Sequence, residues 1–422
     1  MIPALQRAVT CAALTLSCAS LARAQAAPSV PLANVDPLHQ AGRNVTISLL
    51  TMGTSPDQIW EFFGHDAVWI HDNVTGRDTL FNWGVFDFSQ PHFIPRFLEG
   101  RMLYAMGSDP LGDQIRAYQR LNRSVLAQEL DLTAQQRDSI LHQIQWYARP
   151  ENVNYRYDYY RDNCATKVRD IIDNAIGGQI KAKAGALTGT TYRSHSLRLM
   201  QLNLPIMLGV DIGLGRPADH DLTKWQTMFL PTPLHDFLST LQVTDSAGGM
   251  HPLVKREVVL FQATRPPEPD APPTLWPWLL GAGLILAALF VVLGRADGRA
   301  AGMVAGVLIG VWSLVAGILG TLLTLLWTVT DHVFAHANEN LLLFNPLWLV
   351  LAVVALVSLW RGRESPWFRT WAAGLALLAA LALVAHLVRF SAQDNLALIG
   401  LALPPALAIA WVARLKRPVR SS

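Results

Sequence analysis

Cys164 is the side chain of this sequence best suited to nucleophilic chemistry. Two of the three cysteines, Cys11 and Cys18, fall within a predicted signal peptide, so the exported protein keeps one thiol that has no internal disulfide partner. Cys164 follows the polar run Arg161–Asn163 and opens a predicted helix. A thiol at a helix N-terminus has a lowered pKa and is a better nucleophile. We therefore expect Cys164 to be the nucleophile of an acyl-transfer centre, and an inert buried cysteine is the alternative.

His65 is the expected base that takes the proton of this thiol. It follows Phe62-Phe63-Gly64 and leads into a predicted strand that ends near Asp72, and papain-like enzymes present their base at the start of a core strand. His71, on the same predicted strand, is the competing base. For either residue the alternative is a surface histidine or a satisfied histidine of the core.

Asn82 is the expected third group, which would orient the base. It lies on the next predicted strand, from which its side chain would reach His65 across the strand pair. Asp66, Asp72 and Asp87 are the alternatives for this role.

The residues that lead into Cys164 are candidates for binding a substrate. Tyr159 and Arg161 belong to an aromatic and basic stretch that either lines a groove or forms an ordinary aromatic strand. Asn163 adjoins the thiol and is a residue type that caps helices. The free backbone N–H groups at the start of the helix are expected to bind a tetrahedral oxyanion.

The elements that must position these residues mix strands and helices without a regular repeat, which predicts an α+β domain over residues 30–262. Runs of apolar and β-branched residues predict strands near 45–53, 67–72, 79–84 and 124–132. Amphipathic segments with capping residues predict helices at 111–121, 133–148 and 164–176.

The composition separates an exported soluble part from a membrane part. The chain has 422 residues, of which 51% are hydrophobic and 15% charged, and the deficit of charge is concentrated after about residue 275. Residues 1–25 have the early arginine, apolar stretch and Ala-x-Ala site of a signal peptide. Prolines at 263–274 predict a stiff linker. The net charge of +3 is small and does not indicate nucleic-acid binding.

Five apolar segments within residues 275–416 predict an all-α transmembrane bundle of about five helices. Arginine and lysine gather in alternate connections between these segments and towards the end of the chain, which includes the tail 417–422. The positive-inside rule then places the tail in the cytoplasm and the soluble domain in the periplasm. Because the spans are helical, we expect a multi-pass protein of the bacterial inner membrane.

The connection from Asp331 to Asn340 is unusually polar for a loop between two apolar segments. It contains His332, His336, Asn338 and Asn340, which we expect to form a patch that meets the soluble domain and a lipid headgroup. Two histidines at i and i+4 could also bind a metal ion. No third histidine lies near them, so we expect neither a metal site nor a cofactor.

Four segments resemble those of the Lnb-type lipoprotein N-acyltransferase family, namely Phe63–Ala67, Phe81–Phe88, Tyr155–Asp170 and His336–Pro346. The resemblance implies a periplasmic domain similar to circularly permuted papain-like thiol enzymes, in which the histidine precedes the cysteine, followed by membrane helices. It also implies that an acyl chain passes from a phospholipid to Cys164 as a thioester, and then to the α-amino group of a bacterial lipoprotein's N-terminal cysteine.

Two other functions remain open at the level of the sequence. The first is a membrane-anchored papain-like amidase or peptidase that acts on cell-wall peptides, for which five spans exceed the needs of a tether. The second is a non-enzymatic envelope protein that binds lipid or a partner, in which Cys164 has no chemical role.

Overall fold

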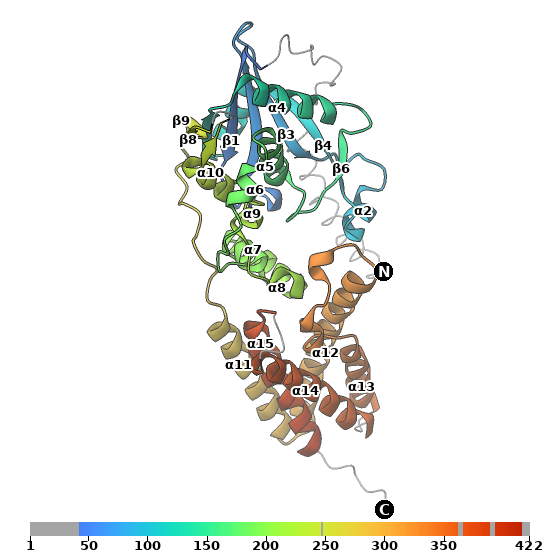
Figure 1. Ribbon diagram of the computed structural model, residues 1–422. Helices are drawn as coiled ribbons and strands as arrows, with labels where there is room; N and C mark the ends of the chain where they lie inside the picture. Colours follow the sequence, from blue (N-terminus) through green and yellow to red (C-terminus); the bar gives the residue numbers. More distant parts are fainter. Residues whose placement is uncertain (1–41, 246–247, 362–365, 389–392, 416–422) are drawn as a thin grey trace, which may run out of the picture. The chain divides into compact units, whose positions relative to one another are not determined.

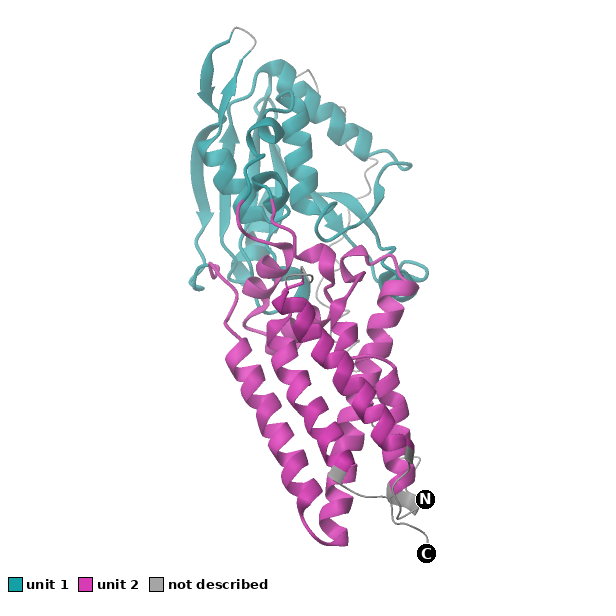
Figure 2. Cartoon of the chain, turned by 60° about the horizontal axis from the view of Figure 1, so that its bottom comes forward, with its two compact units in different colours: residues 1–187, 223–267 teal, residues 188–222, 268–422 magenta. Residues whose placement is uncertain are grey.

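The computed structural model describes residues 42–245, 248–361, 366–388 and 393–415. The predicted signal peptide, residues 1–25, and the predicted cytoplasmic tail, residues 417–422, lie outside the described residues. The chain divides into two compact units, residues 1–187 with 223–267 and residues 188–222 with 268–422 (Figure 2). The second unit thus takes one segment from the middle of the chain and combines it with the apolar C-terminal part.

The first unit is built on an antiparallel sheet whose strands follow the order β6-β4-β3-β2-β1-β5-β9 (Figure 1). A separate hairpin pairs β7 with β8. The strands are β1 (Val45–Met52), β2 (His65–Asp72), β3 (Asp78–Val85), β4 (Leu103–Pro110), β5 (Val125–Leu130), β6 (Asn154–Arg156), β7 (Gln242–Thr244), β8 (Met250–Pro252) and β9 (Val254–Phe261).

Alternation of side chains along the strands gives the sheet two buried faces. Residues such as Ile47, Leu49 and Val68 belong to one core, which includes apolar residues of α4, α5 and α10. Leu50 and Ala67 belong to a second core, on the side of α3. The helices of this unit are α2 (Phe93–Glu99), α3 (Leu111–Arg120), α4 (Ala134–Tyr147), α5 (Cys164–Ala175), α6 (Gln179–Lys183), α9 (Lys224–Thr227) and α10 (Pro231–Thr240). The prediction of an α+β domain is confirmed.

The second unit contains five helices, within the described residues, that are long and apolar enough to cross a membrane. This confirms the predicted bundle. The long helices of this unit are α11 (Trp276–Arg295), α12 (Arg299–Thr328), α13 (Leu347–Arg361), α14 (Pro366–Leu387) and α15 (Leu396–Leu415). The third apolar span is Glu339–Ser358, in which a short 3-10 helix at Glu339–Leu342 precedes most of α13. Two shorter helices of the central segment belong to the same unit, α7 (Tyr192–Met200) and α8 (Leu204–Gly213).

Side-chain amides join the C-terminal end of α8 to the loops between the membrane helices. Asn338 and Asn340 both donate to the carbonyl of Ile212, at 2.9 and 3.0 Å, and Gln393 donates to the carbonyl of Leu214 at 3.2 Å. The last carbonyls of a helix have no partner within it, so these amides supply the missing hydrogen bonds. Residues 188–222 are therefore fixed to the membrane helices through the polar connections of the bundle.

A buried ion-pair network holds the same segment together. The guanidinium of Arg193, which is only 1% exposed, pairs with Asp211 at 2.7 Å and with Asp219 at 2.8 Å. It also donates to the backbone carbonyls of Asp211 and Leu214, at 2.7 and 2.8 Å. Both carboxylates would be left buried without a counter-charge if the guanidinium were removed, and such a loss costs several kcal/mol.

We expect Arg193→Met to destabilise the second unit by about 3–5 kcal/mol, because the substitution leaves two buried carboxylates unpaired. The measurement is the melting temperature of the purified full chain in detergent, together with the rate of proteolysis within residues 188–222. Arg116→Met is the matched control, since Arg116 pairs with Asp113 at an exposed position. Equal melting temperatures for the two variants would contradict the structural role assigned to Arg193.

Candidate active site

The thiol of Cys164 is positioned by the capped N-terminus of α5. Asn163 is the N-cap, and its side-chain oxygen accepts from the backbone N–H of Thr166 at 3.0 Å. The amide nitrogen of Asn163 donates to the carbonyls of Tyr159 and Phe229, at 3.0 and 2.9 Å. The predicted helix therefore begins at Cys164, as expected from the sequence. The polar atoms of Asn163 are used to fix this helix end, which makes Asn163 a positioning residue in the structure.

A glycine with a left-handed backbone conformation in β3 lies beside the start of α5. Gly84 has φ of +87°, and the register between β3 and β4 shifts between Trp83 and Val85. A Cβ atom added at Gly84 would lie 3.8 Å from the Cβ of Cys164 and 3.9 Å from the Cε2 of Tyr157. A positive φ and a β-bulge are both conditions that favour glycine. The bulge at Gly84 thus lies directly beside the thiol.

His65 is the first residue of β2 and lies next to the same helix end. The backbone N–H of Asp66, the residue that follows it, is directed at the sulfur of Cys164 and lowers the pKa of the thiol. The Nε2 atom of His65 lies 3.0 Å from the Oδ1 atom of Asn82, on the neighbouring strand β3. With Nε2 donating to Asn82, Nδ1 is the nitrogen that is left to accept a proton. The predicted contact between these two strands is present.

Asn82 is itself held by Asp109 of β4. Its Nδ2 atom donates to Oδ2 of Asp109 at 3.3 Å, which fixes the amide with its oxygen towards His65. Burial is the main cause that raises the pKa of Asp109. Asp109 was not among the residues expected from the sequence. The pairing of Asn82 with Gly107 places Asp109 two residues further along β4 on the same face, and that register is not visible in the sequence.

The alternative bases and orienting groups make other contacts. His71 pairs with Asp78 at 2.8 Å. Asp66 accepts a hydrogen bond from the hydroxyl of Thr51 at 2.8 Å. Asp72 and Asp87 each accept backbone N–H groups of the turns that follow them.

Burial dominates the electrostatics of the pair formed by Cys164 and His65. Although Cys164 as a whole residue is only half-buried, desolvation raises the pKa of its thiol above the ordinary value of 9.0. Desolvation also lowers the pKa of His65 below its ordinary value of 6.5, and the hydrogen bond that His65 donates to Asn82 opposes this shift. The expectation of a lowered thiol pKa is therefore wrong for the unliganded protein. The N–H groups of the helix end do stabilise a thiolate, but the loss of hydration outweighs them.

A buried arginine lies within electrostatic range of both groups. Arg123 is 4% exposed, and its Nη1 atom lies 3.6 Å from Oε1 of Glu61. Its Nε atom donates to the carbonyl of Gly53 at 2.8 Å. The positive charge of Arg123 lowers the pKa of both Cys164 and His65, so it favours a thiolate and a neutral imidazole. No motif in the sequence marks Arg123, because it follows α3 in a short turn and reaches the site only in the folded chain.

Aromatic rings extend from the thiol towards an exposed apolar helix of the same unit. Each ring centroid lies 4.2–5.2 Å from the next along this aromatic strip, which consists of Tyr157, Tyr104, Phe86, Phe88 and Phe93. Phe93 begins α2, whose large apolar side chains Ile94, Phe97 and Leu98 are 61%, 48% and 62% exposed.

The other predicted substrate-binding residues lie in two places. Arg161 forms two hydrogen bonds to the carboxylate of Asp158, and Tyr159 packs edge-on against Tyr160, in the turn before Cys164. The four residues of the polar loop belong to the second unit. These four residues are His332, His336, Asn338 and Asn340. The side chains of Asn338 and Asn340 donate to backbone carbonyls of α8, and the Nε2 atom of His336 lies 2.9 Å from the carbonyl oxygen of Thr330. Among the described residues no group of three or more His, Cys, Asp or Glu could hold a metal ion.

We expect alkylation of Cys164 by iodoacetamide to accelerate steadily with pH and to reach its midpoint above pH 9.0, since burial keeps the thiol neutral at neutral pH. The measurement is the alkylation rate of the purified chain between pH 5 and 10, followed by mass spectrometry. Cys164→Ala supplies the blank. A fast rate that is constant from pH 5 to 8 would instead reveal a preformed thiolate–imidazolium pair.

Comparison with known proteins gives two matches, one in each part of the chain. Residues 40–198 match a family model described as the Lnb N-terminal periplasmic domain. Residues 272–403 match a family model described as the Lnb transmembrane domain. No curated protein and no solved structure matches the chain.

Proposed function

Because the chain belongs to the Lnb family, whose two domain models match most of it, we propose that it is a lipoprotein N-acyltransferase. The proposed donor is a phospholipid and the proposed acceptor is the α-amino group of a bacterial lipoprotein's N-terminal cysteine. Cys164 is the proposed nucleophile, His65 the base and Asn82 the group that orients His65.

The first half of the proposed reaction moves the acyl chain onto the protein. His65 takes the proton from Cys164 as the sulfur attacks the ester carbonyl carbon of the phospholipid. The backbone N–H groups near the sulfur are those of Cys164, Ala165 and Asp66. In this proposal they also stabilise the tetrahedral oxyanion. The carbon–oxygen ester bond then breaks, and the departing lysophospholipid oxygen takes the proton back from His65. The product is a thioester on Cys164.

The second half transfers the chain to the amine. The α-amino nitrogen attacks the thioester carbonyl, and His65 accepts a proton from that nitrogen. The carbon–sulfur bond breaks, the amide forms, and the sulfur of Cys164 recovers its proton from His65. A neutral thiol and a neutral imidazole, which burial favours here, are the starting state that this general-base cycle requires.

The observation that supports a lipid substrate most directly is the aromatic strip that links the thiol to α2. An acyl chain needs an apolar path to the nucleophile, and exposed apolar side chains that form a patch commonly mark a lipid or partner contact. A peptidase acting on hydrophilic cell-wall peptides has no need of such a path. The exposed residues Ile94 and Leu98 at the end of the strip are where we propose that the domain meets lipid.

Basic residues support the proposed orientation of the protein. Arg295 and Arg299 lie between α11 and α12, and Arg369 lies at the start of α14, whereas the connection after α12 has no Lys or Arg from Thr328 to Pro346. By the positive-inside rule the arginine-rich ends face the cytoplasm. We propose that the protein resides in the inner membrane with Cys164 in the periplasm.

The decisive experiment expresses the full chain in a bacterium depleted of its own lipoprotein N-acyltransferase. Mass spectrometry of a reporter lipoprotein should show a third acyl chain with the wild type and two chains with Cys164→Ala. A reporter that keeps two acyl chains with a well-expressed wild type would contradict the transferase proposal. A third chain added by Cys164→Ala would contradict the thiol mechanism, and release of cell-wall peptides would favour the amidase alternative.

We expect the double substitution Ile94→Asp and Leu98→Asp to lower acyl transfer from bilayer phospholipid about tenfold or more, because two charges at the lipid contact oppose its burial. Transfer from a short-chain, water-soluble donor should change less than twofold. The measurement is the rate of N-acylation with each donor.

Val74→Asp is the matched control, since Val74 is 71% exposed in the turn between β2 and β3. Equal losses with both donors would indicate damage to the fold or to the thiol centre. They would rule out a specific loss of lipid contact at α2.

A further inference from the structure

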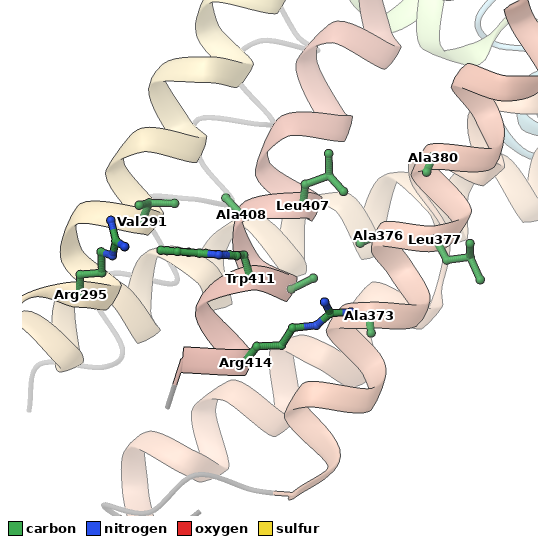
Figure 3. A pocket seen from close by; sticks show the side chains of 11 residues that line it. Val291, Arg295, Ala373, Ala376, Leu377, Ala380, Leu407, Ala408, Trp411 and Arg414 are labelled. Carbon is green, nitrogen blue, oxygen red and sulfur yellow. The ribbon is translucent and has the colours of Figure 1, made fainter. Parts of the chain in front are cut away.

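A groove between three membrane helices is lined by none of the residues of the thiol centre. It has a volume of about 760 Å³ and lies among α11, α14 and α15 (Figure 3). Its wall is made of alanine and leucine side chains, among them Ala373, Ala376, Leu377 and Leu407. The volume falls in the range of pockets that hold organic ligands, and the small side chains leave room for an apolar chain.

Two arginines stand at one end of this apolar groove. Figure 3 shows Arg295 beside the ring of Trp411 and Arg414 extending along the other side of that ring towards Ala373. The guanidinium of Arg295 lies 4.5 Å from the centre of the Trp411 ring. Stacking on an aromatic ring orients a guanidinium and leaves its N–H donors available. Among the described residues neither arginine has an ion-pair partner.

The positions of the two arginines identify the end of the helix bundle at which they lie. Arg295 is the last residue of α11, Arg414 lies in the last turn of α15, and Ala373 lies near the start of α14. The same helix ends adjoin the arginine-rich connections. By the positive-inside rule they lie at the cytoplasmic surface, whereas Cys164 is proposed to face the periplasm.

We propose that this groove binds one anionic phospholipid of the cytoplasmic leaflet. The phosphate would lie at the end of the groove that carries Arg295 and Arg414, and an acyl chain would lie along the alanine and leucine wall. Charge complementarity selects the headgroup, since basic pockets between helices on the cytoplasmic side suit anionic headgroups. The bound lipid would bridge α11 and α15 to α14, so its proposed role is to stabilise the bundle. It is distinct from the acyl donor at Cys164.

The experiment uses the full chain, extracted from nanodiscs that contain equal amounts of phosphatidylglycerol and phosphatidylcholine. Native mass spectrometry counts the lipids that remain bound. Wild type should retain one phosphatidylglycerol, and Arg295→Gln with Arg414→Gln should lower that retention on the order of tenfold, because both headgroup contacts are lost.

The matched control is the double variant Arg299→Gln with Arg369→Gln. It removes the same charge from the same end of the bundle, but neither arginine lines the groove. It should lower retention less than twofold. Ala380→Phe is a second test, since it fills the groove while both arginines stay in place, and it should also displace the lipid. Equal retention in the two arginine double variants, or equal retention of phosphatidylcholine and phosphatidylglycerol by wild type, would overturn the proposal.

Discussion

Burial of the Cys164 thiol and of the His65 imidazole is the constraint on which the proposed chemistry of this protein depends. Loss of hydration disfavours both charged forms, so it raises the pKa of the thiol and lowers that of the imidazole. Burial therefore favours the neutral form of each group, and in the proposed mechanism the thiolate forms as the substrate reacts. A thiol of this kind is protected from unspecific oxidation and alkylation, which require the thiolate.

The surrounding structure compensates for this burial at several points. The backbone N–H groups of Asp66 and Ala165 and the charge of Arg123 each favour the thiolate that burial disfavours. The amide oxygen of Asn82 accepts a hydrogen bond from His65 and so favours the protonated imidazole, and Asp109 fixes the orientation of that amide. Burial and these polar groups thus act in opposite directions on the pKa values of Cys164 and His65, and in the proposed mechanism the polar groups stabilise the charged forms.

Polar groups determine the organisation of the second unit in a similar way. Its membrane helices offer few polar contacts, and the amides of Asn338, Asn340 and Gln393 in their loops bind the end of α8. Asn338 and Asn340 were expected to meet the soluble domain and a lipid headgroup, and in the structure their side chains donate to a backbone carbonyl of residues 188–222. The segment that the sequence order would assign to the soluble part is consequently a component of the membrane unit.

The sequence by itself determined the local elements and the separation of soluble and membrane parts. The start of α5 at Cys164, the capping box of Thr133 and Gln136, and the five apolar helices follow from capping residues and hydropathy, which act over a few neighbouring positions. The contact from His65 to Asn82 could be predicted because the two strands are consecutive in the chain.

Only the tertiary structure decided the electrostatics of the thiol centre and the unit to which residues 188–222 belong. Helix-end position alone suggested a lowered thiol pKa, and burial reversed the sign because desolvation depends on every residue packed around the sulfur. Strand register brings Asp109 next to Asn82, and the folding of distant turns brings Arg123 together with Glu61. No local pattern in the sequence predicts these contacts. Arg295 likewise meets the ring of Trp411 only when α11 packs against α15.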